Sequence, residues 1–238
     1  LIANASVNIQ GISAVVGQSV PYGVWASSAY VTLSSVSVST SGGLGIYTAG
    51  VRVSSWSAIS YSSVTVWNAH GIWLDGSSMT SVAYSTAVTG TTGFQALYLL
   101  DADGNTVTDS YFRNLSGMAV NLAPGSDRNT ISRSTMIASA AVGWYGLYLW
   151  NADSNTVTDS YMQSVAGEGA YLDTGADYNT ISLSTMVSGT ADRSALYLFA
   201  ADGNLVSGSY ASNPAGYAVT LDGGSDYNTV SQSTIVGN

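Results

Sequence analysis

The chain lacks several residue types that most functional sites depend on. Its 238 residues include no cysteine and no lysine, one histidine (His70) and one glutamate (Glu168). Without cysteine there are no disulfides, thiolate nucleophiles or cysteine-based metal sites. Charged residues make up only 8% of the chain, and the net charge is −9. Nucleic acids and anionic membranes attract clustered lysine and arginine, so neither is expected as a partner.

Long apolar runs are also missing. No stretch of about 18 apolar residues occurs, so no membrane insertion is expected. Serine, threonine, glycine, alanine and asparagine fill the composition instead, and a surface with few charges is typical of extracellular or cell-surface proteins. The sequence opens at Leu1 without methionine or a signal peptide, so we expect a processed product or a fragment.

A repeat of about 25 residues is the strongest signal that is present. Leu97-Tyr98-Leu99 recurs at 147–149 and 196–198, with related triplets midway between the copies. Six asparagines follow the same period, at Asn105, Asn129, Asn155, Asn179, Asn204 and Asn228. Their spacings of 24, 26, 24, 25 and 24 residues follow from these positions and define one coil.

Each repeat predicts strands. The triplets alternate apolar and outward residues, and Gly, Asn, Asp and Ser bound them. Upstream, Ile72-Trp73-Leu74, Ile46-Tyr47-Thr48 and Val24-Trp25-Ala26 extend the series to nine coils, and residues 1–20 form a partial tenth. A leucine-rich repeat has a similar period but a different leucine pattern. We therefore expect one all-β domain over 1–238, most regular over 71–238.

Three inward apolar columns imply three strands in each coil around a packed core. The asparagine column marks one corner, where we expect asparagine itself to adopt the left-handed conformation and its amides to stack along the axis. A serine column marks the next corner. Because both columns recur in every regular coil, we interpret them as structural.

These patterns resemble the right-handed parallel β-helix repeats of the pectate-lyase-like superfamily, including NosD-like proteins. The resemblance rests on apolar-x-apolar, then Asp-x-Asn-Thr-(Val/Ile), then Ser-x-apolar, and it covers roughly residues 20–238. It implies a right-handed parallel β-helix of nine to ten coils. It implies little about function, because the superfamily includes polysaccharide lyases, hydrolases, epimerases, tailspikes, adhesins and structural repeats.

The sequence does not provide a recognisable set of catalytic residues. His70 lies in a segment that resembles the Gly-His-Gly segment of polygalacturonases, but only Asp75 is near it in sequence. The downstream basic motif of those enzymes is missing. We therefore predict no catalytic residues.

A column of aspartates suggests the one cofactor that we consider. Each aspartate stands two residues before a ladder asparagine, at Asp103, Asp127, Asp153, Asp177, Asp202 and Asp226. Either these side chains bond to the backbone in tight turns, or the stacked carboxylates bind Ca²⁺ weakly. Otherwise no cofactor is expected.

An outward aromatic column is the main candidate contact face. It consists of Trp25, Tyr47, Trp73, Tyr98, Tyr148, Tyr171 and Tyr197. Such a stripe fits cross-strand stacking, protein assembly or glycan binding. A second outward array, of Thr-x-Thr and Thr-x-Ser, is similar to the lattice of ice-binding solenoids.

The leading functional hypothesis is a non-catalytic, extracellular structural or adhesive rod. Segment 233–238 ends within a coil without a cap, so we expect end-to-end or lateral self-association. The alternative is a polysaccharide-binding or polysaccharide-degrading β-helix, and the second alternative is an ice-binding solenoid.

Overall fold

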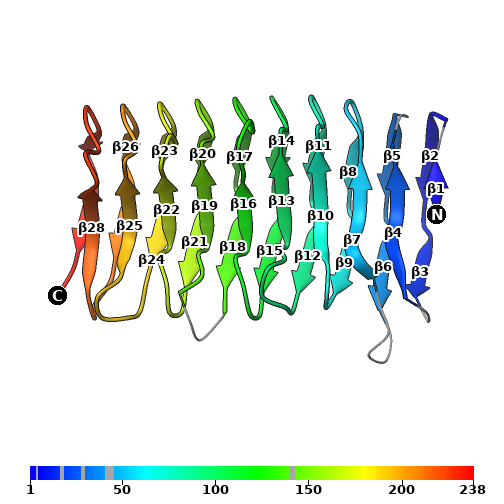
Figure 1. Ribbon diagram of the computed structural model, residues 1–238, viewed down its shortest axis with the longest axis horizontal. Helices are drawn as coiled ribbons and strands as arrows, with labels where there is room; N and C mark the ends of the chain where they lie inside the picture. Colours follow the sequence, from blue (N-terminus) through cyan, green and yellow to red (C-terminus); the bar gives the residue numbers. More distant parts are fainter. Residues whose placement is uncertain (4, 17–18, 28–29, 41–45, 140–142) are drawn as a thin grey trace.

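The protein is an elongated stack of coils (Figure 1). The computed structural model describes residues 1–238 except 4, 17–18, 28–29, 41–45 and 140–142. The chain winds along the long axis, and its two termini lie at opposite ends of the stack. Within the described residues, no helix has the length and apolar character needed to cross a bilayer.

The strands form three parallel sheets of ten strands each. Sheet 1 contains β1 (Ile2–Ala3), β4 (Val20–Ala26), β7 (Ile46–Val53), β10 (His70–Asp75), β13 (Leu97–Leu100), β16 (Val120–Leu122), β19 (Leu147–Trp150), β22 (Ala170–Asp173), β25 (Ser194–Phe199) and β28 (Tyr217–Asp222). Sheet 2 contains β2 (Val7–Gln10), β5 (Val31–Ser34), β8 (Ala58–Ser60), β11 (Ser81–Ala83), β14 (Thr106–Thr108), β17 (Thr130–Ser132), β20 (Thr156–Thr158), β23 (Thr180–Ser182), β26 (Leu205–Ser207) and β29 (Thr229–Ser231). Sheet 3 contains β3 (Ser13–Val16), β6 (Ser37–Thr40), β9 (Ser63–Val66), β12 (Thr86–Thr89), β15 (Tyr111–Asn114), β18 (Thr135–Ala138), β21 (Tyr161–Ser164), β24 (Thr185–Val187), β27 (Tyr210–Ser212) and β30 (Thr234–Val236).

This architecture confirms the predicted fold class. Each strand pairs with the strand three places along the chain, so one coil contributes one strand to every sheet. Residues 1–20 contain β1, β2 and β3, which provide the partial tenth coil that the sequence predicts. Successive copies of the repeat stack in register, as in the pairing of β10 with β13.

The core is a continuous column of apolar side chains inside the three sheets. In one coil Leu97, Val107 and Phe112 come from the three different sheets, and each is 0% exposed. Met136, Met162 and Met186 fill the following coils and are also fully buried. Burial of this apolar surface is the main stabilising term, and flexible methionine fits an irregular interior well.

A ladder of asparagines closes the corner between sheets 1 and 2. The backbone N–H of each asparagine donates to the Oδ1 of the asparagine one coil further on, at 2.7–2.8 Å, from Asn105 to Asn228. A parallel serine ladder closes the corner between sheets 2 and 3, with N–H to Oγ distances of 3.1–3.2 Å between Ser85 and Ser233. The backbone pairing of the sheets therefore continues around both corners.

The left-handed conformation at these corners lies one residue earlier than predicted. It is taken by the residue that precedes each asparagine: Gly104, Arg128, Ser154, Tyr178, Gly203 and Tyr227. The physical reason is that the asparagine side chain is buried at the corner, where its Oδ1 accepts the backbone N–H of the asparagine in the adjacent coil. The preceding residue then makes the turn and directs its side chain to solvent, where Tyr227 is 91% exposed.

The predicted register of the early coils is wrong at one strand. Trp25 and Trp73 are both paired with Arg52, not with Tyr47. Strand β7 is longer than the regular strands, and its pairing with β4 shifts register between Val20 and Tyr22. The triplet at 46–48 therefore lies at the start of β7, before the residue that pairs with Trp25. The side chain of Tyr47 lies outside the described residues.

The ladder gives a stability prediction. Asn129→Ala removes Oδ1, the acceptor for Asn105 N–H at 2.8 Å, and Nδ2, the donor to Ala102 O at 2.8 Å. Buried groups left without partners should lower the free energy of unfolding by about 2–3 kcal/mol, measured by urea denaturation. Asn68→Ala is the control, because Asn68 is exposed and accepts one bond from the Thr91 hydroxyl. Equal losses in both variants would contradict a stabilising role of the ladder.

Candidate functional site

The outer side of sheet 1 carries most of the predicted aromatic column. Trp25, Trp73, Tyr98, Tyr148, Tyr171 and Tyr197 stand on β4, β10, β13, β19, β22 and β25 and occupy matched register positions. Each is partly exposed, because neighbouring rings cover part of its surface. Together with the rings that contact them, these residues form what we refer to as the aromatic face.

A second row of side chains lies three residues earlier on the same face. Tyr22 stacks on Trp25 with ring centroids 5.0 Å apart. His70 lies 5.3 Å from Trp73 with the two rings tilted. Between them on β10, a Cβ on Gly71 would lie 2.4 Å from the carbonyl oxygen of Ala96, so only glycine fits there. The ring contact shows that His70 and Trp73 lie on the same side of the sheet.

The N-terminal half of the face is organised around Arg52. Its guanidinium lies 4.7 Å from the ring centroid of Trp73 and 5.7 Å from that of Tyr22. It donates to the Tyr22 hydroxyl at 2.9 Å and forms an ion pair with Asp75. Both ring contacts are cation–π interactions, so Arg52 links three coils of the face.

His70 is enclosed by aromatic rings. It stacks on Tyr98 at 4.6 Å, and Phe94 meets it edge-on at 5.2 Å. The backbone N–H of Gln95 donates to its Nδ1 at 3.2 Å, so the remaining proton is on Nε2. Burial lowers the pKa of His70 to about 4, so the imidazole is neutral at physiological pH.

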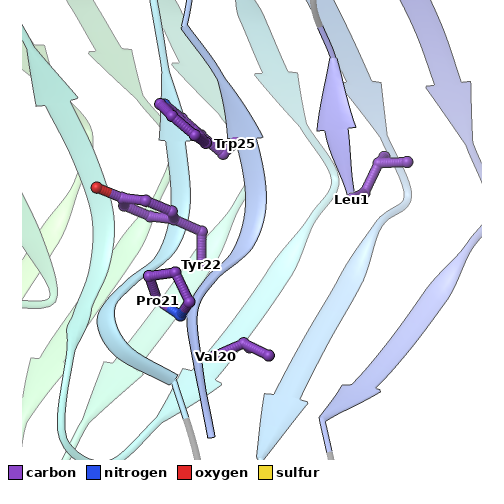
Figure 2. Close-up of a pocket in the computed structure, with 5 residues that line it drawn as sticks. All are labelled: Leu1, Val20, Pro21, Tyr22 and Trp25. Atoms are coloured by element: carbon purple, nitrogen blue, oxygen red, sulfur yellow. The ribbon is translucent and has the colours of Figure 1, made fainter.

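The N-terminal end of the face borders a pocket of about 260 Å³ (Figure 2). Tyr22 and Trp25 line it together with Leu1, Val20 and Pro21. Figure 2 shows the two rings placed one after the other along β4. The pocket is thus a continuation of the aromatic surface and contains no charged side chain.

The C-terminal half of the face is a tyrosine cluster. Tyr148, Tyr171 and Tyr197 follow one another on successive coils, with ring centroids 5.4 Å and 4.9 Å apart. Tyr145 meets Tyr171 edge-on at 5.0 Å, and Phe199 lies 6.2 Å from Tyr197. The rings thus form one contiguous cluster, and the Tyr148, Tyr171 and Tyr197 side chains in it are partly exposed.

Carboxylates border this tyrosine cluster. The Tyr148 hydroxyl donates to Asp173 Oδ2 at 2.6 Å, and the Tyr197 hydroxyl donates to Asp222 Oδ2 at 3.3 Å. Burial raises the pKa of Tyr148 well above its usual value, and Asp173 raises it further. These phenols are therefore hydrogen-bond donors at any physiological pH.

Glu168 lies at the other border of the tyrosine cluster and is almost fully buried, with 4% exposure. Arg193 Nη1 lies 3.5 Å from its Oε1, and its Oε2 has no hydrogen-bond partner among the described residues. Burial raises the pKa of Glu168, and Arg193 partly opposes this effect. It is thus a carboxyl group that holds its proton more strongly than usual.

Asn121 separates the two halves of the face. It is paired with Tyr98 on one side and Tyr148 on the other. It is 8% exposed, and its Oδ1 is buried without a partner. From β4 to β25 the face covers eight successive strands of sheet 1, which is about 34 Å at roughly 4.8 Å per strand.

The aspartate column lies away from this face, at the corner that the asparagine ladder closes. Oδ1 of each aspartate from Asp103 to Asp202 accepts the backbone N–H of the next aspartate at 2.7–2.9 Å. In the described part of the chain, no group of three or more His, Asp or Glu side chains could hold a metal ion. Calcium prefers six to eight oxygen ligands, which these separate turns do not supply, so calcium binding stays a prediction without structural support.

The threonine array stands on the outer side of sheet 2. Its two lanes are in register from β14 to β29, and Ser182 Oγ lies 3.1 Å from Thr158 Oγ1. Leu205 interrupts one lane, as the sequence indicates. Ice binding stays a prediction.

Sequence reasoning missed several residues of the aromatic face. Tyr22, His70, Tyr145 and Glu168 belong to the second row, whose offset of three residues does not follow strand alternation. A usable signal is the recurring glycine, Gly71, Gly146 or Gly169, preceded each time by a large side chain. Arg52 was missed because the register of β7 was assigned wrongly.

The sequence matches the family described as "Right handed beta helix region" over residues 49–235. The chain belongs to this right-handed β-helix family. The match confirms the resemblance noted from the repeats and fixes the handedness of the β-helix. No curated protein sequence matches the chain.

Solved structures share the fold of this β-helix at low sequence identity. DFA-IIIase from Arthrobacter chlorophenolicus A6, in complex with GF2, superposes with a TM-score of 0.67 and 15% identity, over 98% of this chain and 67% of that chain. The Dettilon tailspike protein gp208 gives 0.59 and 11%, over 99% of this chain and 60% of that chain. The periplasmic alginate epimerase AlgG gives 0.50 and 11%, over 90% and 70%. The β-helix thus spans about two thirds of the DFA-IIIase chain.

These comparisons correct the leading functional hypothesis from the sequence. The similar structures include an enzyme, a tailspike and an alginate epimerase, and this finding favours the polysaccharide-related alternative over a purely structural or adhesive rod. The physical reason for the error is that a regular repeat is equally suited to both roles. The same register that builds a rod also holds side chains in fixed rows on one face.

The enclosure of His70 predicts a pH dependence of stability. Its pKa of about 4 in the folded chain lies below the ordinary 6.5, so the unfolded chain binds the extra proton first. Stability should therefore be highest above pH 6.5 and should fall towards pH 4, by at most about 3 kcal/mol. Chemical denaturation at pH 7 and pH 4.5 measures this loss.

His70→Gln is the control, because His70 is the only histidine and every carboxylate titrates equally in both proteins. The variant should lose less stability on acidification than the wild type. Identical losses would mean that His70 is not enclosed as described.

Proposed function

We propose that the protein binds a polysaccharide chain along the aromatic face of sheet 1. The observation that carries this proposal is the combination of partly exposed rings with hydroxyl and carboxylate groups in two rows on one face, interrupted only by Arg52 and Asn121 in the first row. Sugars offer apolar C–H surfaces and many hydroxyl groups, so they need both kinds of contact. The similarity of the fold to DFA-IIIase, a tailspike protein and AlgG supports the same proposal.

The dimensions of the face favour a long ligand. A surface of about 34 Å along the axis accommodates several sugar units, each within reach of a ring or a carboxylate. Tyr148 and Tyr171 present partly exposed rings, and Asp173 accepts a hydrogen bond from the Tyr148 hydroxyl beside them.

Substitution of single rings tests the proposal. Trp73→Ala and Tyr171→Ala should each weaken binding of the tightest-binding polysaccharide about tenfold or more, because central aromatic contacts usually dominate affinity. Isothermal titration calorimetry or affinity electrophoresis measures the change. Circular dichroism and the melting temperature show whether each variant keeps its fold.

Tyr84→Ala is the matched control. Tyr84 stacks on Tyr61 with centroids 5.0 Å apart, but this pair lies at the corner between sheets 2 and 3 and is well exposed. Its removal should leave binding unchanged. Equal effects of Tyr84→Ala and Tyr171→Ala would show that the binding surface is not the aromatic face. If the chain bound no polysaccharide, the proposal as a whole would be contradicted.

A second candidate function is cleavage or rearrangement of the bound glycan. Glu168 favours it, because general acids in glycan chemistry are carboxyl groups whose pKa is raised by their surroundings. Burial raises the pKa of Glu168, and its Oε2, beside Tyr145, has no hydrogen-bond partner among the described residues. Reducing-end assays and chromatography of polysaccharides incubated with the protein would detect product.

Glu168→Gln keeps the shape of the side chain and removes the proton. If the second candidate function is correct, this variant should bind glycan as the wild type does and release at least tenfold less product. Absence of any product from polysaccharides that bind would leave the face as a binding surface only. Extracellular location and self-association stay predictions from the sequence.

A further inference from the structure

We infer that the aromatic face selects uncharged glycans and excludes polyanionic ones. This inference rests on the proposed function and defines the ligand class of the same face. It depends on how the charged side chains are distributed among the described residues. A polyanion requires a basic surface, whereas the accessible charges of this face are acidic.

Two acidic groups at the C-terminal end of the face are accessible. Asp222 is exposed at the end of β28, and Asp173 is partly exposed at the end of β22. Oδ2 of each accepts a tyrosine hydroxyl from the preceding coil, and Oδ1 of each accepts the backbone N–H of the following residue. Carboxylates in this position can accept hydrogen bonds from sugar hydroxyls, but they repel the carboxylates or sulfates of a polyanion.

The basic groups of the face are already neutralised. Arg52 is held by Asp75 and lies against two rings, and Arg193 is paired with Glu168. Arg128 and Arg133 form ion pairs with Asp103 and Asp109 outside the face. The remaining arginine, Arg113, stands on sheet 3 and donates to Ser139.

The sequence has no lysine to compensate, and the net charge of the chain is −9. At low salt the whole molecule therefore repels a polyanion, because charges act over about 10 Å at 0.1 M salt and over longer distances at lower salt. Binding of a neutral glycan depends on ring contacts and hydrogen bonds and is nearly independent of salt.

Two matched pairs of ligands test the inference: polygalacturonate with its methyl ester, and dextran with dextran sulfate. Members of a pair share a backbone and differ in charge. Binding is measured in EDTA, and again with Ca²⁺ added. The neutral member of at least one pair should bind, and its charged partner should bind at least tenfold more weakly with or without Ca²⁺.

Charge reversal at Asp222 sharpens the test. Asp222→Lys should strengthen binding of the charged ligands about tenfold at low salt, because two units of charge change within about 5 Å of the ligand, and high salt should abolish the gain. Asp159→Lys is the control with the same net charge. Asp159 is exposed at the corner between sheets 2 and 3, where Arg133 occupies the equivalent position one coil earlier, so lysine fits there.

The outcomes separate the two proposals. Tight binding of polygalacturonate or dextran sulfate by the wild type would overturn the charge selectivity but leave glycan binding intact. Equal gains in Asp222→Lys and Asp159→Lys would also overturn it, because the selectivity would then reflect net charge and not the face. No binding of any neutral or charged polysaccharide would overturn the proposed function itself.

Discussion

Parallel backbone pairing between successive coils is the constraint on which the rest of the structure depends. Each coil must place its three strands in register with those of its neighbours. The hydrogen bonding between coils must also continue past the corners between sheets 1 and 2 and between sheets 2 and 3, where the strands end. The buried asparagine and serine ladders meet this requirement, because each side-chain oxygen accepts a backbone N–H from the adjacent coil. The corners thus continue the hydrogen bonding of the sheets and do not interrupt it.

The same constraint explains why the candidate site is a set of rows. A side chain that points outward in one coil lies beside its counterpart in the next, so aromatic residues gather into stacks once the sequence places them at equivalent positions. A second row three residues earlier brings His70 and Tyr145 beside the first row. Chemistry of the face is therefore decided by a few positions per coil.

Most of the fold and part of the site could be predicted from the sequence, for a physical reason. Strand alternation, the coil period and the buried polar columns each depend on which residue type stands at regularly spaced positions, so they can be read directly from the sequence. Arg52 and Tyr47 show where this reasoning fails, because the long strand β7 pairs with a shifted register that no local pattern reveals. The ion pair of Arg193 with Glu168 depends on side chains 25 residues apart meeting across a coil, and strand alternation does not predict the row that contains Glu168.

The stack of coils has a consequence for how such a protein evolves. Each coil contacts little beyond its neighbours, and pairs of coils repeat with a period near 50 residues, as Leu97, Leu147 and Leu196 show. Duplication of one such pair would lengthen sheet 1 by two strands, or about 10 Å, without disturbing the rest of the molecule. If the face binds a glycan as proposed, the number of coils would set the length of glycan that it contacts, while substitutions within a coil would change what is recognised at that coil.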